Sequence, residues 1–459
     1  MLNAVSQWVD DHSDRLLAEL FDLIRIPSVS TAPEHKADVE RAAHFTADKM
    51  RAAGLENVEI IPTAGHSLLY GDWLHAPGAP TVLCYGHYDV QPPDPLELWV
   101  TPPFEPALRD GNIYARGAVD DKGQFYMHIK AIEALMAVHG KLPVNVKFLV
   151  EGEEEIGGKS ISAFVPTAQE KLRADVALVS DTALYAPGLP TLCVGLRGLV
   201  YLEIEAQGPA RDLHSGLYGG AAPNAVYGLV QLLAKMKDAE GRILIPGIYS
   251  EVAEPTAEEK ASWARLPFSE ADFLNHEVGA ASLVGEPERT VLERVWSRPT
   301  LEVHGIAGGF TGAGAKTVIP ATATAKVSLR LVPDQKPEHI LQLVKDFVAT
   351  HTPPGIRAEV RVLSHSPGLV VDPAHPAMDI AAQAFEEMMG AETVFIRSGG
   401  SIPIVGEFHQ HLGIPTILMG FGLPDDGLHS PNEKFKLANY YLGIKTVARF
   451  LEKYGAGEK

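Results

Sequence analysis

Residues 81–92 read TVLCYGHYDVQP, and this stretch decides how the rest of the chain is interpreted. The apolar run Thr81–Tyr85 is typical of a buried strand, but it ends at a glycine and is followed by His87 and Asp89. Polar groups are costly to bury without partners, so a strand seldom ends on two of them without a reason. His87 and Asp89 therefore belong either to a solvated turn or to a functional site.

Polar side chains also follow the other apolar runs that we expect to be strands. They come after VKFLV, after VALVS, after TILMG and its glycine-rich loop, and in ARGAVDDKG before an expected helix: Glu151, Glu153, Glu154, Glu155, Asp181, His429, Asp120 and Asp121. In an open parallel α/β sheet, ligands bind outside the carboxyl ends of the strands. We therefore expect these side chains to gather at one edge of a sheet.

Short apolar runs alternate with helical patterns from about residue 80 to 195 and again near the C-terminus. This alternation predicts an α/β fold with a mostly parallel sheet and helices on both faces. Between these parts, alternating strand patterns and two helices predict an inserted α+β domain. We expect a catalytic domain in two parts, 1–196 and 366–459, interrupted by a lid and dimerisation domain at 197–365.

Composition limits the classes of partner. The 459 residues include 39 basic and 58 acidic ones, and the net charge of −19 disfavours nucleic acid and anionic membranes as partners. No apolar stretch approaches the ~18 residues that cross a bilayer, and the N-terminus lacks the apolar core of a signal peptide. Two cysteines indicate a reducing compartment. We expect a soluble cytoplasmic protein of two domains.

The clustered residue types form a hard set of nitrogen and oxygen ligands. Two histidines and three or four carboxylates, with no useful cysteine, suit a pair of Zn²⁺ ions, with Mn²⁺ or Co²⁺ as alternatives. A carboxylate that bridges two ions ~3.5–4 Å apart makes a hydrolytic centre. In such a centre a glutamate that is not a ligand takes the proton of a shared water.

Each motif also has an ordinary structural interpretation. A single loop histidine is usually structural, an Asp-Asp pair is usually a turn or cap, and EGEEE alone is typical of a solvated acidic turn. Ser430, Pro431 and Glu433 fit a helix start with a capping box. That box explains neither His429 nor the clustering of ligand-type residues at strand ends.

The motifs GHYDV, RGAVDDKG, EGEEEIG, VSDT and GLHSPNE resemble the metal motifs of the di-zinc peptidases that include cytosolic non-specific dipeptidase and carnosinase. Wider relatives are glutamate carboxypeptidase, acetylornithine deacetylase and succinyl-diaminopimelate desuccinylase. The resemblance implies that one metal ion is held by His87, Asp120 and Asp181. It implies that the other is held by Asp120, Glu155 and His429, with Asp120 bridging both.

The same resemblance implies roles for two further carboxylates. Glu154 resembles the general base, which works with a hydroxide that bridges the metals, and Asp89 resembles the carboxylate that orients His87. A cis peptide is implied between Asp120 and Asp121.

Residues of the lid match the dipeptidase branch of this family more narrowly. In DLHSGLYGG, His214 resembles a residue that polarises the scissile carbonyl in the partner subunit's active site, which implies a homodimer. Thr317 and Arg330 resemble residues that hold a small peptide substrate, the arginine by its free carboxylate. Gly400 and Ser401, in SGGSIP, resemble a further substrate-binding loop.

Two departures from the family pattern affect these assignments. Ser398 precedes the glycines of SGGSIP where the dipeptidases carry a glutamate, which leaves the side-chain preference open. The extra acid Glu153 makes the roles of Glu154 and Glu155 depend on the register of EGEEE.

Three alternatives to a dipeptidase are an N-acyl amino acid deacylase, a non-catalytic scaffold and a phosphate-binding protein. An N-acyl amino acid deacylase would use the same metals and base, and a non-catalytic scaffold would have no need of Glu154. GGFTGAGAKT at 308–317 approaches a phosphate-binding loop, but Ala315 separates Gly314 from Lys316. His409 and His411, at i, i+2 spacing, are expected to be structural.

Overall fold

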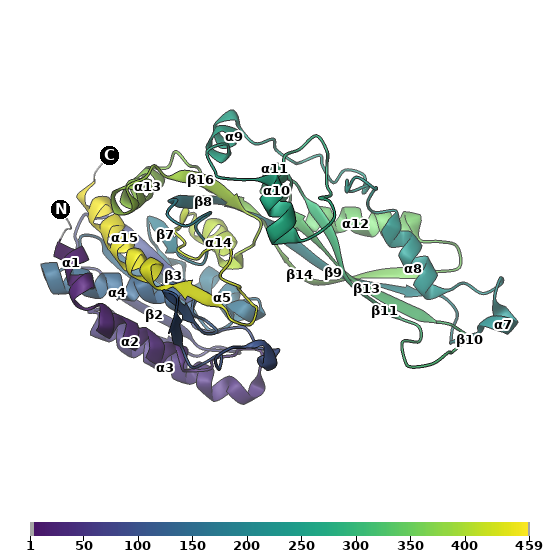
Figure 1. Ribbon diagram of the computed structural model, residues 1–459, viewed down its shortest axis with the longest axis horizontal. Helices are drawn as coiled ribbons and strands as arrows, with labels where there is room; N and C mark the ends of the chain where they lie inside the picture. Colours follow the sequence, from purple (N-terminus) through teal and green to yellow (C-terminus); the bar gives the residue numbers. More distant parts are fainter. Residues whose placement is uncertain (1–3, 458–459) are drawn as a thin grey trace. The chain divides into compact units, whose positions relative to one another are not determined.

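The computed structural model describes residues 4–457, which form two compact units (Figure 1). We call them the large unit, with residues up to 194, 371–396 and from 402, and the inserted unit, with residues 195–370 and 397–401. The changeovers fall at 194/195 and 370/371, where the sequence predicted 196/197 and 365/366. Residues 397–401 also group with the inserted unit.

A nine-stranded sheet forms the centre of the large unit. Its order is β1-β2-β6-β3-β7-β17-β8-β15, with β16 also paired to β8. The strands are β1 (Glu56–Ile61), β2 (Leu68–Trp73), β3 (Thr81–His87), β6 (Asn145–Glu151), β7 (Val176–Val179), β8 (Thr191–Leu196), β15 (Leu369–Val370), β16 (Val394–Ser398) and β17 (Thr416–Leu418). The central strands β6, β3, β7 and β17 are parallel to one another, and their neighbours are antiparallel. The α/β prediction is confirmed.

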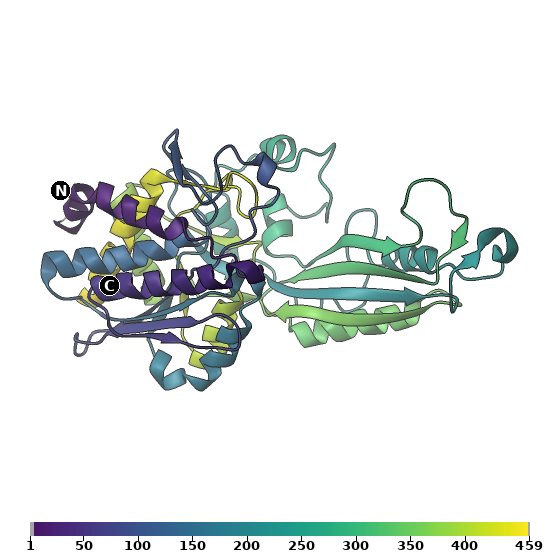
Figure 2. The same cartoon turned by 90° about the horizontal axis from the view of Figure 1, so that it is seen from below.

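Helices lie on both faces of this sheet (Figure 2). They are α1 (Ala4–Asp11), α2 (Ser13–Ile24), α3 (Lys36–Ala52), α4 (Lys122–His139), α5 (Lys159–Phe164), α6 (Gln169–Leu172), α13 (Pro376–Met389), α14 (Pro403–Glu407) and α15 (Leu437–Ala456). Helix α4 is buried along most of its length and packs between β3 and α15, so it needs no polar face. It ends at Gly140, whose φ of 67° closes the helix in the left-handed region. Within residues 4–457, no helix combines the length and apolar composition that a bilayer crossing requires.

The sequence patterns of residues 159–172 and 432–454 each predict one helix, but the structure differs in both places. The segment KSISAFVPTAQEKL is broken into α5, a 3-10 turn at Val165–Thr167 and α6, because Pro166 cannot donate an amide hydrogen bond inside a helix. The closing helix begins at Leu437, and Lys434–Lys436 form strand β18 instead. This strand pairs with β5 (Asn112–Tyr114), which pairs with β4 (Ala107–Arg109).

The inserted unit is an antiparallel sheet with helices packed against it. Its order is β11-β13-β9-β14, formed by β11 (Thr300–Gly308), β13 (Thr322–Leu331), β9 (Gly198–Gln207) and β14 (Arg357–Ser366). Side chains of β9 alternate between buried and partly exposed, because one face meets α8 (Ala225–Ala234) and α12 (Pro337–His351). A two-stranded ribbon joins β10 (Leu213–His214) to β12 (Val318–Ile319), and short helices α7 (Ser215–Tyr218), α9 (Ala257–Trp263), α10 (Glu270–Asp272) and α11 (Val291–Trp296) complete the unit.

Candidate metal centre

The carboxyl ends of the parallel strands bring two groups of metal-ligand side chains together. One group is His87, Asp120 and Asp181, and the other is Asp120, Glu155 and His429; within each group the ligand atoms lie within 4.8 Å of one another. Asp120 belongs to both groups, with Oδ1 3.3 Å from His87 Nε2 and Oδ2 3.0 Å from His429 Nε2. Every residue that the sequence predicted as a ligand is in one of these groups.

Four of the five candidate ligands lie at or beyond the end of a strand of the central sheet. His87 is the last residue of β3, Asp181 follows β7, and Glu155 lies in the 3-10 turn after β6. Asp120 lies in the loop before α4, and its peptide bond to Asp121 is cis, as the resemblance implied. His429 lies in the loop after β17 with a φ of 59° and is more than half exposed.

The residues fit a pair of divalent ions. His87 Nε2 and Glu155 Oε1 are buried atoms without a hydrogen-bond partner, and both residues belong to the ligand groups. An unpaired buried polar atom is costly, and a metal ion would accept its lone pair. Imidazole nitrogens and carboxylate oxygens are ligands that suit Zn²⁺, Mn²⁺ and Co²⁺.

The electrostatics of the cluster also favour bound cations. Burial raises the pKa of Asp181 well above its usual range, and the pKa of Glu155 rises to about 8 through burial and the nearby Asp120 carboxylate. Burial acts in the same direction on Asp120, but the close approach of the His429 and His87 rings outweighs it and holds the pKa of Asp120 low. Bound divalent ions would offset the repulsion between these carboxylates and lower their pKa values, because a cation stabilises the ionised form.

Asp89 contacts both the metal ligand His87 and the loop that carries Glu154. His87 Nδ1 lies 3.1 Å from the Asp89 carbonyl oxygen, and donation to it leaves Nε2 free to bind a metal. The Asp89 carboxylate accepts hydrogen bonds from the backbone amides of Glu154 and Glu155, at 3.2 Å each. One buried residue therefore holds a histidine through its carbonyl and two neighbouring glutamates through its carboxylate.

The contacts of Glu153 favour one register of EGEEE. Its carboxylate turns away from the ligand groups and accepts from the backbone amides of His66 and Ser160, both at 3.0 Å. Glu155 joins the second ligand group, and Glu154 is beside the cluster without belonging to either group. Burial raises the pKa of Glu154, which favours a carboxylate that can take up a proton.

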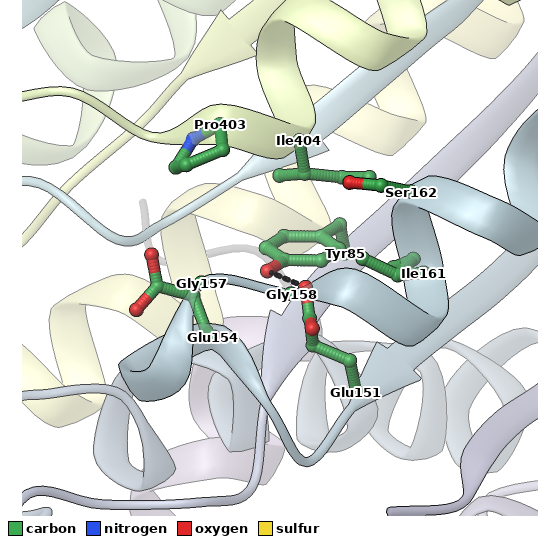
Figure 3. A pocket seen from close by; sticks show the side chains of 9 residues that line it. All are labelled: Tyr85, Glu151, Glu154, Gly157, Gly158, Ile161, Ser162, Pro403 and Ile404. Atoms are coloured by element: carbon green, nitrogen blue, oxygen red, sulfur yellow. Dashed lines mark hydrogen bonds between the residues drawn. The ribbon is translucent and has the colours of Figure 1, made fainter. Parts of the chain in front are cut away.

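A small hollow adjoins Glu154 (Figure 3). Its residues are Tyr85, Glu151, Glu154, Gly157, Gly158, Ile161, Ser162, Pro403 and Ile404. The Tyr85 hydroxyl donates to Glu151 at 2.7 Å, and Figure 3 shows the Glu154 carboxylate pointing away from this pair. Sequence reasoning gave Tyr85 no role, because a tyrosine within an apolar run has no distinguishing local pattern.

The prediction of a capping box at Ser430–Glu433 is wrong. Residues around 430 form turns, and α15 begins only at Leu437. Glu433 is fully buried and binds the loop that carries Asp120, a contact across 313 residues that no local pattern could indicate. His409 and His411 lie in a short π-helical segment (Phe408–Leu412), outside both ligand groups, with His411 beside Glu407 at 3.3 Å.

The inserted unit holds the predicted substrate-binding residues in two places. In the first, exposed His214 pairs with Val318 across the ribbon, and the Ser215 amide donates to the Thr317 carbonyl at 3.1 Å. His214 Nδ1 accepts from the Gly216 amide at 3.0 Å, so in the neutral ring Nε2 carries the proton and can donate.

The second place is the loop 399–401. Arg330, on β13, donates from Nη1 to Ser401 Oγ at 2.8 Å, and the Arg197 amide donates to the Gly400 carbonyl at 3.0 Å. Burial lowers the pKa of Arg330. The segment that approached a phosphate-binding loop is an exposed connection between β11 and β12 with no helix after it, which excludes that arrangement.

Fold and site together define a metallopeptidase of the dipeptidase type. The family model described as peptidase family M20/M25/M40 matches residues 83–453, and the chain belongs to this family. The Cys-Gly metallodipeptidase dug1 of Schizosaccharomyces pombe is 34% identical over 98% of this chain and 98% of the relative. The Beta-Ala-His dipeptidase of Homo sapiens is 31% identical, covering 98% of this chain and 92% of the relative.

A solved structure is similar over the same length. The di-peptidase Dug1p from Saccharomyces cerevisiae has a TM-score of 0.86 and 31% identity, with 100% of this chain and 99% of that chain covered. These relatives favour the dipeptidase hypothesis over the deacylase alternative.

Proposed function

We propose that the protein hydrolyses dipeptides and short peptides with a free C-terminal carboxylate at a centre of two divalent ions, Zn²⁺ in the first place and Mn²⁺ or Co²⁺ as alternatives. The observation that carries this proposal is the pair of ligand groups that share Asp120, with Glu154 beside them as a carboxylate outside both groups. Relatives named Cys-Gly metallodipeptidase and Beta-Ala-His dipeptidase support dipeptides as the substrate class.

Glu154 is proposed as the proton carrier. When bound, the two ions lower the pKa of water and polarise the scissile carbonyl. Glu154 takes a proton from the attacking water and delivers it to the leaving amine, a role that its raised pKa supports. Asp89 keeps His87 and the Glu154 loop in position through the hydrogen bonds described above.

The inserted unit is proposed to supply substrate binding. Arg330 would bind the C-terminal carboxylate through its guanidinium fork, beside Gly400 and Ser401, and Thr317 would hold the peptide. His214 would donate its Nε2 proton to the oxygen of the scissile carbonyl, a contact often worth ~3–4 kcal/mol in the transition state.

We propose that the enzyme is a cytoplasmic homodimer in which the partner subunit's His214 completes each site. The inserted unit supports this because β11 is an edge strand whose residues from Glu302 onward are exposed, Val303 and Ile306 among them. Tyr227 and Val230 on α8 of the same unit are exposed apolar side chains as well. The two buried free cysteines, Cys84 and Cys193, are consistent with a reducing compartment.

A panel of substrates tests the activity. The metal-reconstituted enzyme is assayed with Cys-Gly, β-Ala-His and Ala-Ala, with C-terminally amidated versions, and with N-acetyl and N-succinyl amino acids. Free dipeptides should be hydrolysed, and amidation should reduce kcat/KM because Arg330 loses its carboxylate partner.

The variant Glu154→Gln tests the role of Glu154 in the same assay. It should lose at least ~100-fold in kcat while it retains two ions per chain, because Glu154 moves protons and is not a ligand. Faster turnover of acyl amino acids than of every dipeptide would refute the proposal. Loss of bound metal in the variant would refute the role of Glu154.

A further inference from the structure

Glu433 is a buried carboxylate just after the metal ligand His429. Its exposed fraction is 0%, and both of its oxygens are occupied by donors from a single distant segment. Oε2 accepts from Arg116 Nη1 at 2.6 Å and from the Gly117 amide at 3.0 Å. Oε1 accepts from the amides of Val119 at 2.9 Å and Asp120 at 3.2 Å.

These hydrogen bonds join two loops that carry metal ligands. The donors lie within residues 116–120 and include the amide of Asp120, the aspartate shared by both ligand groups. The acceptor is four residues beyond His429. The backbone adds a further link, because the Ala115 amide donates to the Glu433 carbonyl at 3.1 Å. The Glu433 carboxylate therefore helps to set the separation between Asp120 and His429, whose side chains are 3.0 Å apart.

The other end of the Asp120 loop is also fixed. Lys122 is fully buried and donates from Nζ to the carbonyls of Leu23 and Ile26, at 3.2 and 2.6 Å. The loop is thus attached to the end of α2 on one side and to Glu433 on the other. Glu433 links it to the segment of His429, and the Asp121 carboxylate, which accepts from the His87 amide at 3.2 Å, links it to the segment of His87.

We propose that Glu433 is a positioning residue that sets the distance between Asp120 and His429 and thereby the affinity of the metal site formed by Asp120, Glu155 and His429. The inference rests on the di-metal centre of the proposed function and adds a residue outside both ligand groups. The first ligand group takes only Asp120 from the linked loops, so it depends less on Glu433.

The substitution Glu433→Gln tests this role with almost no change of shape. Each carboxylate oxygen faces two donors, so in either orientation the amide nitrogen of glutamine would meet two donors instead of accepting from them. Glu433→Asp is the second variant: it keeps the charge but is too short by one methylene to reach all four donors.

Glu286→Gln is the matched control. Glu286 is 6% exposed and forms a two-pronged pair with Arg298, Nε and Nη2 each donating at 2.8 Å, within the inserted unit and outside both ligand groups. Its loss should lower the melting temperature as the loss of any buried ion pair does. It should not change metal binding.

The experiment is a titration of the metal-free full-length proteins with Co²⁺, followed by visible absorption and checked by metal analysis. The wild type and Glu286→Gln should bind two tight equivalents. Glu433→Gln should bind one tight equivalent, with the second weakened about 10- to 100-fold, as found when partners of metal ligands are removed, and Glu433→Asp should fall between.

Two tight equivalents at wild-type affinity in either Glu433 variant would overturn the inference, and so would a matching loss in Glu286→Gln. The proposed function fails by a different measurement. A wild-type enzyme that binds two ions and hydrolyses no dipeptide would refute the activity and leave the role of Glu433 intact, whereas fewer than two tight ions in the wild type would overturn both.

Discussion

Single residues in the large unit show how strongly burial changes the chemistry of a side chain. His128, on α4, is buried beneath the segment of Asp181, with Nε2 2.7 Å from Ser180 Oγ. The Ser180 hydroxyl donates to the Met419 carbonyl, so it must accept from His128, which leaves Nδ1 without a proton or a partner. Burial lowers the pKa of His128 to about 3.

This shift predicts a pH dependence of stability. Between pH 3 and 6.5 the unfolded histidine binds a proton that the folded one does not, so the free energy of unfolding should fall as the pH falls through this window. The contribution is about 1.4 kcal/mol per pH unit for one proton. Denaturant unfolding of metal-free wild type and His128→Gln from pH 4 to 6 measures it, because the variant lacks this proton and its slope should be smaller by that amount. Parallel curves for the two proteins would contradict the prediction.

The sequence predicted the role of a residue only where that residue was part of a recognisable local motif. The pattern of apolar strands predicted that ligand-type residues gather at one sheet edge, and the resemblance to the di-zinc peptidases implied the particular set of His87, Asp120, Glu155, Asp181 and His429. Glu433, Lys122 and Tyr85 act through contacts with segments far away in the sequence. Their partners become known only when the loops are placed in space.

At the scale of elements, the junction between the Asp120 loop and α4 is tightly packed. Gly123 lies in the first turn of α4, and a Cβ there would be 1.9 Å from the Ala118 carbonyl oxygen. The obstacle is backbone of the ligand loop, so it cannot move aside without displacing its neighbours.

The substitution Gly123→Ala should therefore reduce both stability and metal binding. We expect a loss of about 3 kcal/mol in the free energy of unfolding from overpacking, with weaker binding of both ions because Asp120 is displaced. Gly305→Ala is the control, since a Cβ there meets no atom within 4 Å. Thermal unfolding and metal content should be unchanged in the control, and a Gly123→Ala protein with wild-type values would show that the loop can shift.

Element boundaries were predictable from pattern only where no tertiary contact competed. Strand β3 and helix α4 follow from apolar periodicity, and they are present as expected. The start of the last helix was misplaced because Lys434–Lys436 pair with β5, a partner more than 300 residues earlier. Here strand pairing outweighed a favourable helix-start pattern in Ser430–Glu433.

At the scale of the whole molecule, the proposed dimer makes each active site depend on two chains. A protein with Glu154→Gln lacks the proton carrier, and one with His214→Ala lacks the carbonyl donor. Neither homodimer should be active. In a mixed dimer, one site receives intact Glu154 from one chain and intact His214 from the other.

Mixing the two inactive proteins after reversible dissociation should restore about a quarter of wild-type activity, because half of the randomly formed dimers carry one complete site. Size-exclusion chromatography verifies the dimers, and mixing without dissociation is the control. No recovery after confirmed exchange, or full activity in a monomer, would refute the arrangement.

The order of the candidate metal ligands along the chain determines when each metal site can be completed during synthesis. His87, Asp120 and Asp181 leave the ribosome early, whereas His429 and Glu433 follow only after the entire inserted unit has been made. A nascent or prematurely ended product therefore contains all three residues of the first ligand group, whereas the second group still lacks His429. A fragment that ends before His429 should therefore lack dipeptidase activity, because one of the two candidate metal sites is incomplete in it.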